Sequence, residues 1–222
     1  MSWESSLEYY RIINETVKEK LGGFRSARIV MYSFDFEEVA KLQHEGRWDE
    51  ATELIIEAAQ KLEKVGAGLL VICTNTMHIV ADEVQRSIKV PLLHIADAAA
   101  EEIKTKGLKK IGLLGTRFTL EKDFYKGRLV KKYGLEVIIP AEHERQIVHD
   151  IIYGELCRGE IKESSREQFI KIIQNLVSNG SEGIILGCTE ICLLVRQQDV
   201  QVPIFDTTAI HATSAALSAM QE

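Results

Sequence analysis

The sequence lacks the features that would place it in a membrane, outside the cell or on nucleic acid. None of its apolar runs approaches the ~18 residues of a membrane-spanning helix. Its opening, MSWESSLEYY, has neither the basic nor the apolar stretch of a secretory signal. The 222 residues carry 33 acidic and 27 basic side chains, a formal net charge of −6 that disfavours a phosphate-binding surface. We therefore expect a cytoplasmic protein that binds neither membranes nor nucleic acid.

Cysteine is scarce, and its spacing fits neither a metal site nor a disulfide framework. The four cysteines form no C-x-x-C pair, and without an export signal we expect reduced thiols. Cys188 and Cys192 lie one helical turn apart, but no third and fourth ligand accompany them. Cys157 follows an amphipathic helical pattern and is expected in the core. Gly112 and Gly115 lack the third glycine of a dinucleotide fingerprint. We predict no metal and no cofactor.

The order of apolar segments is typical of an α/β protein. The expected strands are continuous runs of Val, Ile and Leu rather than apolar–polar alternations, as in parallel sheets covered by helices on both faces. They fall at residues 27–32, 68–72, 91–94, 110–114, 136–139, 183–186 and 203–206. Helices are expected at residues 4–21, 35–43, 48–65, 79–87, 95–106, 121–132, 147–158, 165–178 and 210–220.

The sequence also resembles itself at a spacing of about 113 residues. VPLLHI at residues 90–95 matches VPIFDT at residues 202–207, and SLE at residues 6–8 matches TLE at residues 119–121. Such a repeat predicts two pseudo-symmetric, Rossmann-like lobes that face each other across a site. We place them at residues 1–96 and 97–207, with a C-terminal helix over residues 208–222 that packs back on the first lobe.

The repeat exposes a gap at the start of the first lobe. The second lobe opens with a strand at residues 110–115, ahead of the helix that contains Thr119. At a spacing of 113, most of the matching strand would precede residue 1. We therefore expect the first lobe to lack its first strand.

Polar clusters follow two of the expected strands, CTNTMH at residues 73–78 and GCTE at residues 187–190. Side chains at the carboxyl ends of parallel strands point into the crevice where such sheets bind ligands. Two groups on facing lobes would approach a small substrate from opposite sides. Inversion of a stereocentre needs that arrangement, because one group removes a proton while the other delivers one to the opposite face. Backbone amides of the two turns would stabilise the carbanion.

With these clusters the chain resembles the aspartate/glutamate/hydantoin racemase superfamily, and within it the aspartate and broad-spectrum amino-acid racemases. The resemblance implies two α/β lobes, a homodimer and inversion of Cα by an acid–base pair without pyridoxal phosphate. It implies aspartate, glutamate or another polar amino acid as the small-molecule substrate. The motifs that carry it are MSWES at residues 1–5, CTNTMH at 73–78, LLGT at 113–116, ELCRGEIKESSR at 155–166 and GCTE at 187–190.

One departure from the family concerns the acid–base pair. Family members read Cys-Asn-Thr where this chain reads Thr74-Asn75-Thr76, with Cys73 one place earlier. The spacing of 114 from Thr74 to Cys188 is closer to the repeat than the 115 from Cys73. Neighbouring strand residues face opposite ways, so Cys73 is expected to point away from the cleft. We predict that Thr74 and Cys188 flank Cα, with Cys188 as the working base and unequal initial rates for the two enantiomers.

A second departure concerns the start of the chain. Family members carry a Gly-Leu-Ile-Gly-Gly-like strand ahead of Met-Ser-Trp, which this sequence lacks. Its absence would cost core packing and carboxylate-binding backbone near Met1. We expect a mis-assigned start or a truncated sequence rather than a protein that dispenses with the strand.

Further residues are expected to contact the substrate. Gln43 lies near where acidic-substrate relatives place an arginine, and an amide would bind a distal carboxylate more weakly; a solvated helix residue is the alternative. Lys162 matches a family lysine that could meet the substrate carboxylate, or it is a surface lysine. Thr116 would lend donors, or merely form a turn. Glu190 would hold the ammonium, orient Cys188, or only cap its helix. The other predicted contacts are Met1, Asn75, Thr76 and Thr189.

The sequence thus predicts an amino-acid racemase that uses Thr74 and Cys188. One alternative is a related isomerase such as a hydantoin racemase, which assays of hydantoins beside free amino acids would distinguish. Another is a catalytically weak ligand-binding paralogue, since Thr74 and the missing strand both weaken the site. A binder would show affinity without exchange of the α-proton for solvent deuterium.

Overall fold

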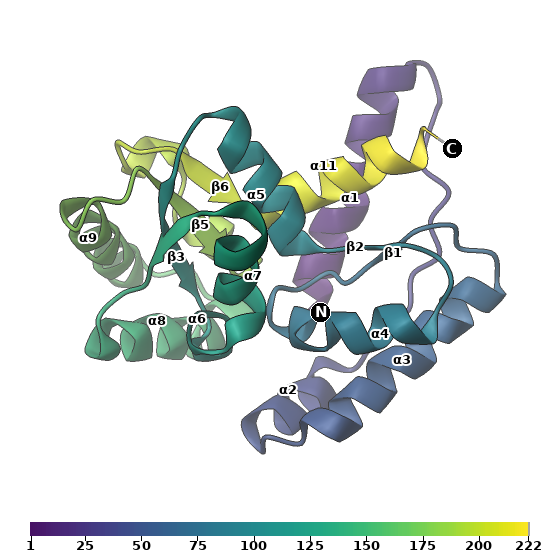
Figure 1. Ribbon diagram of the computed structural model, residues 1–222, viewed down its shortest axis with the longest axis horizontal. Coiled ribbons are helices and arrows are strands. Elements are labelled where there is room, and N and C mark those ends of the chain that lie inside the picture. The colour runs from purple at the N-terminus through teal and green to yellow at the C-terminus, as the bar shows by residue number, and fades with distance from the viewer. Residues whose placement is uncertain (222) are drawn as a thin grey trace.

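The chain folds into two α/β lobes, each built around a parallel sheet (Figure 1). The computed structural model describes residues 1–221. The smaller sheet pairs β1 with β2, and the larger has four strands in the order β4-β3-β5-β6. Every pairing is parallel, which confirms the predicted fold class. The strands are β1 (Leu70–Val71), β2 (Leu92–Leu93), β3 (Lys110–Gly115), β4 (Glu136–Ile138), β5 (Gly183–Gly187) and β6 (Ile204–Asp206).

Helices surround both sheets. They are α1 (Trp3–Leu21), α2 (Phe36–His44), α3 (Trp48–Lys64), α4 (Ala81–Ser87), α5 (Ile95–Thr105), α6 (Arg117–Glu121), α7 (Asp123–Tyr133), α8 (Glu142–Gly154), α9 (Glu163–Ser178), α10 (Ile191–Leu194) and α11 (Thr207–Ala219), with short 3-10 helices η1 (Thr76–Val80), η2 (Leu156–Arg158) and η3 (Gln197–Asp199). Helix α8 begins earlier than the expected residue 147. There the Glu144 carboxylate accepts a hydrogen bond from the Ala141 amide at 3.0 Å and stabilises the helix start.

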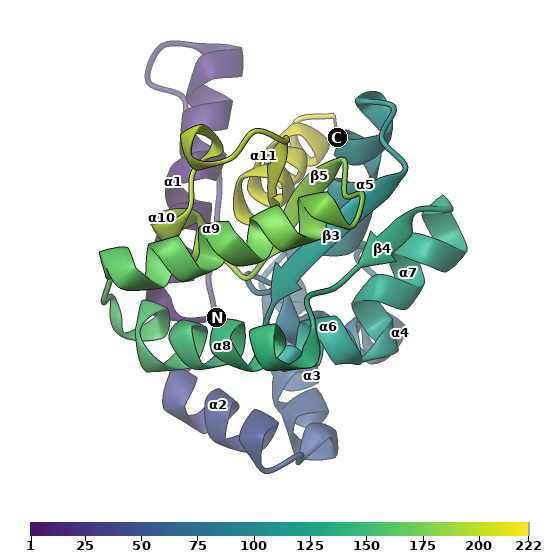
Figure 2. The ribbon, with the colours of Figure 1, turned by 90° about the vertical axis from the view of Figure 1, so that its left-hand side faces the viewer.

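The larger sheet is buried on both faces, which explains its unbroken apolar strands. Leu114 and Ile184 pack against α8 and α9, whereas Leu113 and Ile185 pack with residues of α5 and α7 on the other face. Figure 2 looks onto α8 and α9, which lie across the near face of this sheet. Because side chains alternate along a strand, a strand covered on both sides needs apolar residues at successive positions.

The internal repeat is visible in matching contacts of the two lobes. Gln85 donates to the carbonyl of Val90 and accepts from the amide of Leu92. Gln197, 112 residues later, makes the same two contacts with Val202 and Ile204. In each lobe one side-chain amide therefore ties the turn before the last strand to the helix that precedes it.

The predicted strand over residues 27–32 does not form, and this prediction is wrong. Those residues lie across an open, mainly apolar crevice from β1, with about 810 Å³ of empty space that includes its mouth. In the other lobe β3 fills the matching place, between β4 and β5. A strand needs a neighbour to receive its ladder hydrogen bonds. With no strand between them, residues 27–32 and β1 are left unpaired with each other.

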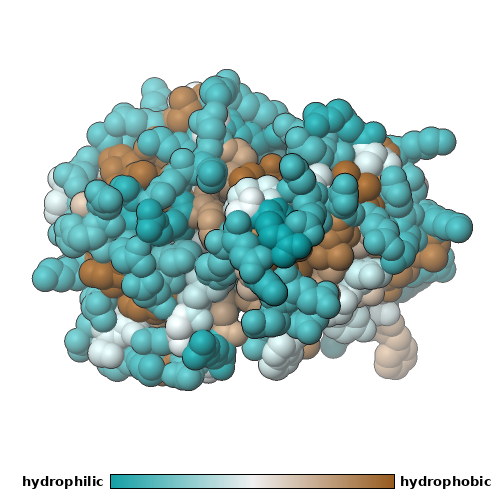
Figure 3. Space-filling view, turned by 90° about the horizontal axis from the view of Figure 1, so that it is seen from below, coloured by the Kyte–Doolittle hydropathy of each residue, from teal (hydrophilic) through white to brown (hydrophobic). Residues whose placement is uncertain are grey.

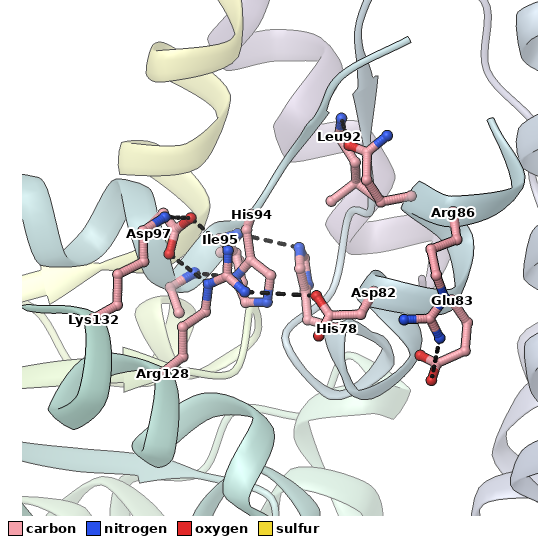
Figure 4. A network of polar contacts seen from close by, with 12 residues as sticks. His78, Asp82, Glu83, Arg86, Leu92, His94, Ile95, Asp97, Arg128 and Lys132 are labelled. Carbon is pink, nitrogen blue, oxygen red and sulfur yellow. Dashed lines mark hydrogen bonds and ion pairs between the residues drawn. The ribbon is translucent and has the colours of Figure 1, made fainter. Parts of the chain in front are cut away.

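Contacts between helices and charged side chains join the two lobes. Helix α11 packs against α1 and α5, and α5 packs in turn against α7. Arg128 and Lys132 of α7 both point at Asp97 of α5, with distances of 2.6 and 2.7 Å between nitrogen and oxygen (Figure 4). Arg128 also reaches Asp82 of α4 at 3.7 Å. Burial alone would raise the pKa of Asp97, but the hydrogen bonds from Arg128 and Lys132 outweigh it and lower the pKa to about 2.

Hydrophilic residues cover most of the surface seen from below, where exposed apolar residues form separate patches (Figure 3). Over residues 1–221, the structure contains no helix with both the length and the apolar character of a membrane span.

Candidate active site

A crevice with about 300 Å³ of empty space lies where three strands end. Thr74 and Thr76 follow β1, Thr116 follows β3, and Cys188 and Glu190 follow β5. Its complete lining is Met1, Ser2, Phe36, Gln43, Thr74, Thr76, Thr116, Ile152, Tyr153, Cys157, Cys188 and Glu190. Both lobes contribute to it, and the five residues that follow these strands stand at their carboxyl ends, where parallel sheets bind ligands.

Glycine is required where β3 and β5 meet at the crevice. A Cβ atom at Gly115 would lie 2.8 Å from the carbonyl oxygen of Gly187, and one at Gly187 would lie 2.6 Å from that of Leu114. Both distances are too short for any side chain. The glycines let the two strands end side by side, so Thr116 and Cys188 enter the same crevice.

The Glu190 carboxylate organises the turn after β5. It accepts hydrogen bonds from the Cys188 thiol at 3.0 Å, the Thr189 hydroxyl at 2.7 Å and the Ser2 hydroxyl at 2.7 Å. Burial, followed by the nearby charge of Glu190, raises the pKa of the Cys188 thiol well above its usual range. Cys188 is therefore a protonated thiol at rest, with a proton acceptor already in hydrogen-bond contact.

Two hydrogen bonds cross between the lobes in a pseudo-symmetric way. Ser2 contacts Glu190 at 2.7 Å, and Thr116 contacts Thr76 at 3.1 Å. The members of each matching pair are 114 residues apart, the same spacing that separates Thr74 from Cys188. Ser2 and Thr116 also cap the helices that follow them, since each hydroxyl accepts from the amide three residues later. Thr74 and Cys188 thus occupy equivalent places on facing lobes.

His78 fixes the backbone at Thr74. Its Nε2 accepts a hydrogen bond from the Ile95 amide at 3.2 Å, so in the neutral ring the proton is on Nδ1. That Nδ1 lies 2.7 Å from the carbonyl oxygen of Thr74 and donates to it. Burial lowers the pKa of His78 well below its usual value, which keeps the ring neutral. Cys73, by contrast, lines the larger apolar crevice beside β1, and burial raises its pKa to about 11.

Gln43 and Tyr153 meet across the lobes at the crevice. The Tyr153 hydroxyl donates to Oε1 of Gln43 at 2.9 Å, and Nε2 of Gln43 contacts the sulfur of Met77 at 3.0 Å. Gln43 is only 2% exposed, so it is not a solvated helix residue. Burial raises the pKa of Tyr153, which therefore stays a neutral hydrogen-bond donor.

Three predicted contact residues do not line the crevice. Lys162 is exposed and forms ion pairs with Glu160 at 3.0 Å and Glu155 at 3.5 Å. Asn75 is buried and donates to the Thr207 hydroxyl at 3.0 Å. Thr189 is also buried and acts through Glu190. The other predicted residues, Met1, Gln43, Thr74, Thr76, Thr116, Cys188 and Glu190, all line it.

Sequence reasoning missed several lining residues. Cys157 was expected in the core; it packs against core residues and also lines the crevice. Tyr153 precedes it by four residues, but the two lie on different helices, α8 and η2, so helical spacing does not relate them. Ser2 could have been found from the repeat, because it lies 114 residues before Thr116. Phe36 and Ile152 gave no signal beyond their hydrophobicity.

Comparison with known sequences gives a consistent family. A profile described as Asp/Glu/hydantoin racemase matches residues 1–215. The broad-specificity amino-acid racemase of Bacillus subtilis is 32% identical over 170 residues, which cover 75% of this chain and 71% of that protein. The glutamate racemase of Aquifex aeolicus is 29% identical over 143 residues, which cover 64% of this chain and 53% of that enzyme.

Solved structures share the fold. A Yersinia pestis protein described as a candidate Asp/Glu racemase is 54% identical with a TM-score of 0.93, covering 100% of this chain and 96% of that one. An aspartate racemase homologue of Pyrococcus horikoshii is 38% identical with a TM-score of 0.82, covering 99% and 95%. The glutamate racemase of Francisella tularensis is 17% identical, with a TM-score of 0.64 over 96% of this chain and 77% of that one, and shares the fold.

Proposed function

The chain belongs to the Asp/Glu/hydantoin racemase family of isomerases, and from this premise we propose that it inverts the α-carbon of an amino acid between Cys188 and Thr74. The observation that carries the proposal is the shared crevice. Both residues line it, from equivalent strand ends on facing lobes. A carboxylate in contact with the Cys188 thiol supplies the acceptor that a base needs.

The proton transfers follow from these contacts. Glu190 takes the thiol proton, and the resulting thiolate of Cys188 removes the proton from Cα as the electron pair of the C–H bond passes to the substrate carboxylate. Thr74 then gives its hydroxyl proton to the opposite face of Cα. The starting state returns when Glu190 releases its extra proton to solvent and the Thr74 alkoxide takes one up from solvent. Backbone amides of the turns after β1 and β5 would hold the negative charge that develops. No step requires pyridoxal phosphate.

The two faces are chemically unequal in this scheme. A hydroxyl is a much weaker acid than a thiol and a much weaker base than a thiolate, so proton transfer at Thr74 limits the rate more than transfer at Cys188. Initial rates at saturation should therefore differ between the enantiomers, whereas the equilibrium between them stays one to one.

Proton NMR in heavy water tests the proposal. The purified protein is incubated with a panel of L-amino acids, and the α-proton signal is followed with time. We expect the signal of the substrate to disappear as deuterium enters at Cα, and Cys188→Ser to slow this loss at least ~100-fold. Binding of an amino acid without exchange would instead identify a ligand-binding protein, and exchange of hydantoins alone would identify a hydantoin racemase.

A further inference from the structure

The residues that line the crevice offer no cationic side chain. Over residues 1–221, its lining contains neither arginine nor lysine, and its one ionisable carboxyl group is that of Glu190. The amino group of Met1 lies at the crevice but donates to the Cys73 carbonyl, and burial lowers its pKa. Lys162, the predicted carboxylate partner, is exposed and paired with Glu155 and Glu160.

A carboxylate on the substrate side chain would therefore be buried without a partner. Every amino acid has an α-carboxylate, and backbone amides of the turns after β1 and β5 can hold this group. A second carboxylate would lose its hydration with only neutral groups nearby and with Glu190 of like charge in the same crevice. Burial of an unpaired charge is strongly unfavourable, and a neighbouring like charge adds to the cost.

The groups that could contact a side chain are neutral instead. Gln43 and Tyr153 present an amide and a phenol, joined by a hydrogen bond of 2.9 Å between helices of the two lobes. Together they can both donate and accept a hydrogen bond. Phe36 and Ile152 add apolar surface beside them. This combination suits an uncharged side chain with a hydrogen-bonding tip, such as an amide.

We propose that Gln43 and Tyr153 determine specificity and that the substrate is an amino acid with an uncharged, hydrogen-bonding side chain rather than aspartate or glutamate. This inference rests on the proposed racemase function. The B. subtilis relative is described as a broad-specificity amino-acid racemase, which supports a substrate other than aspartate or glutamate.

Pairs of substrates that differ only in charge give the sharpest test. The rate of α-proton exchange in heavy water is measured for asparagine against aspartate and for glutamine against glutamate, as kcat/KM. We expect kcat/KM for α-proton exchange to be ~100-fold higher for at least one of the two amides than for the matching acid. The acid would bury an unpaired charge in the crevice, whereas the amide carries no charge on its side chain. Equal or faster exchange of aspartate or glutamate would overturn the inference and leave the racemase function intact. Exchange of no amino acid at all would overturn the racemase function itself.

Substitutions at Gln43 and Tyr153 test whether these two residues determine specificity. Gln43→Arg supplies the missing cation and should raise kcat/KM for glutamate or aspartate at least tenfold while lowering it for the amide. Gln168→Arg makes the same change on the exposed face of α9 and should leave both values unchanged. Because an arginine at the buried position 43 could disturb the fold, Tyr153→Phe serves as a second variant, which removes the hydroxyl and keeps the ring. It should raise KM for the amide several-fold with little effect on kcat. Two results would show that Gln43 and Tyr153 do not determine specificity. One is a folded Gln43→Arg variant with the same preference between amide and acid as the unsubstituted protein, and the other is a Tyr153→Phe variant in which only kcat falls.

Discussion

In the mechanism that we propose, Glu190 is the residue on which the chemistry of Cys188 depends most directly. Its carboxylate accepts three hydrogen bonds, one of them from the Cys188 thiol. The position of Cys188 could be predicted from the sequence, because a polar residue at the end of a buried strand has few places to point. The role of Glu190 could not, since a carboxylate two residues later serves equally well as a helix cap. Only the three-dimensional contact with the sulfur separates the alternatives.

Substitution of Glu190 should change the pH dependence of the reaction in a definite direction. Burial and the charge of Glu190 both raise the pKa of Cys188. Activity that depends on the thiolate therefore rises with pH toward that raised pKa. Glu190→Gln removes the charge and should move the midpoint of the rise to lower pH. At neutral pH, below that midpoint, kcat should fall ~10²-fold, because there the thiolate forms by proton transfer to Glu190 and the variant lacks this acceptor. The pH profile of α-proton exchange measures both effects, with Glu167→Gln on the surface of α9 as control. A midpoint of the pH profile that stays at the same pH or moves to higher pH would contradict the contact between Cys188 and Glu190.

His78 offers a second residue-scale prediction. Because it donates to the Thr74 carbonyl and accepts from the Ile95 amide, it positions Thr74 without touching the crevice. His78→Gln retains a donor on a shorter reach and should lower kcat several-fold for both enantiomers, because Thr74 transfers a proton once in each direction of the reaction. Initial rates from each enantiomer, measured beside thermal unfolding, provide the check. A lowered Tm with kcat unchanged for both enantiomers would mean that His78 only stabilises the fold.

Among the elements, the predicted strand over residues 27–32 shows most clearly what local sequence can and cannot predict. The apolar runs of β3 and β5 predicted strands correctly, because each is flanked by other strands in a four-stranded sheet. The run at residues 27–32 is also mainly apolar, but it pairs with no strand among residues 1–221 and stays irregular beside an open crevice. Strand propensity describes how well a residue suits a sheet, whereas a strand forms only if a partner is present.

A grafted strand should fill that crevice. Fusion of a copy of residues 110–114, KIGLL, directly ahead of Met1 would place an extended apolar segment where β3 lies in the other lobe, in the register that matches Ser2 with Thr116. A net gain of ~2 kcal/mol from the buried aliphatic side chains would raise Tm by about 5 °C in a protein of this size. A graft with its Ile and Leu residues changed to Asp serves as the control. Equal Tm values for the two grafts would show that the crevice does not accept a strand.

At the scale of the whole molecule, three buried histidines join the C-terminal helix α11 to the first lobe. His78 and His94 have ring centroids 4.6 Å apart, and those of His78 and His211 are 5.7 Å apart. His211 on α11 accepts from the Tyr9 hydroxyl of α1 at 2.7 Å and donates to the Leu93 carbonyl of β2 at 2.9 Å. Burial lowers the pKa of His211 to about 4 and that of His94 to about 3. These rings stay neutral while the protein is folded at neutral pH.

The histidines should make the fold sensitive to acid. Below pH 6.5 the unfolded chain binds protons that the folded chain does not, so stability is fully present above that pH and is lost as the pH falls. His211 alone should remove about 2 kcal/mol between pH 6.5 and pH 5, since one pKa unit is worth ~1.4 kcal/mol. Urea unfolding at a series of pH values gives the slope, and His211→Gln should make it shallower while lowering stability at pH 7. A slope unchanged by that substitution would show that His211 is not buried in neutral form.

The repeat itself, and with it the two-lobed plan, could be predicted from short matches in the sequence. Contacts between the lobes could not, because they join residues far apart in the chain. Tyr153 and Gln43 lie 110 residues apart, and no sequence pattern at either position predicts the hydrogen bond between them.

The most direct test of the pairing of Thr74 with Cys188 is the initial rate from each pure enantiomer in the unsubstituted protein, Thr74→Ala and Cys73→Ala. We expect unequal rates from the two enantiomers, a strong loss of activity in Thr74→Ala, and activity retained in Cys73→Ala. Equal rates that vanish in Cys73→Ala and persist in Thr74→Ala would contradict it.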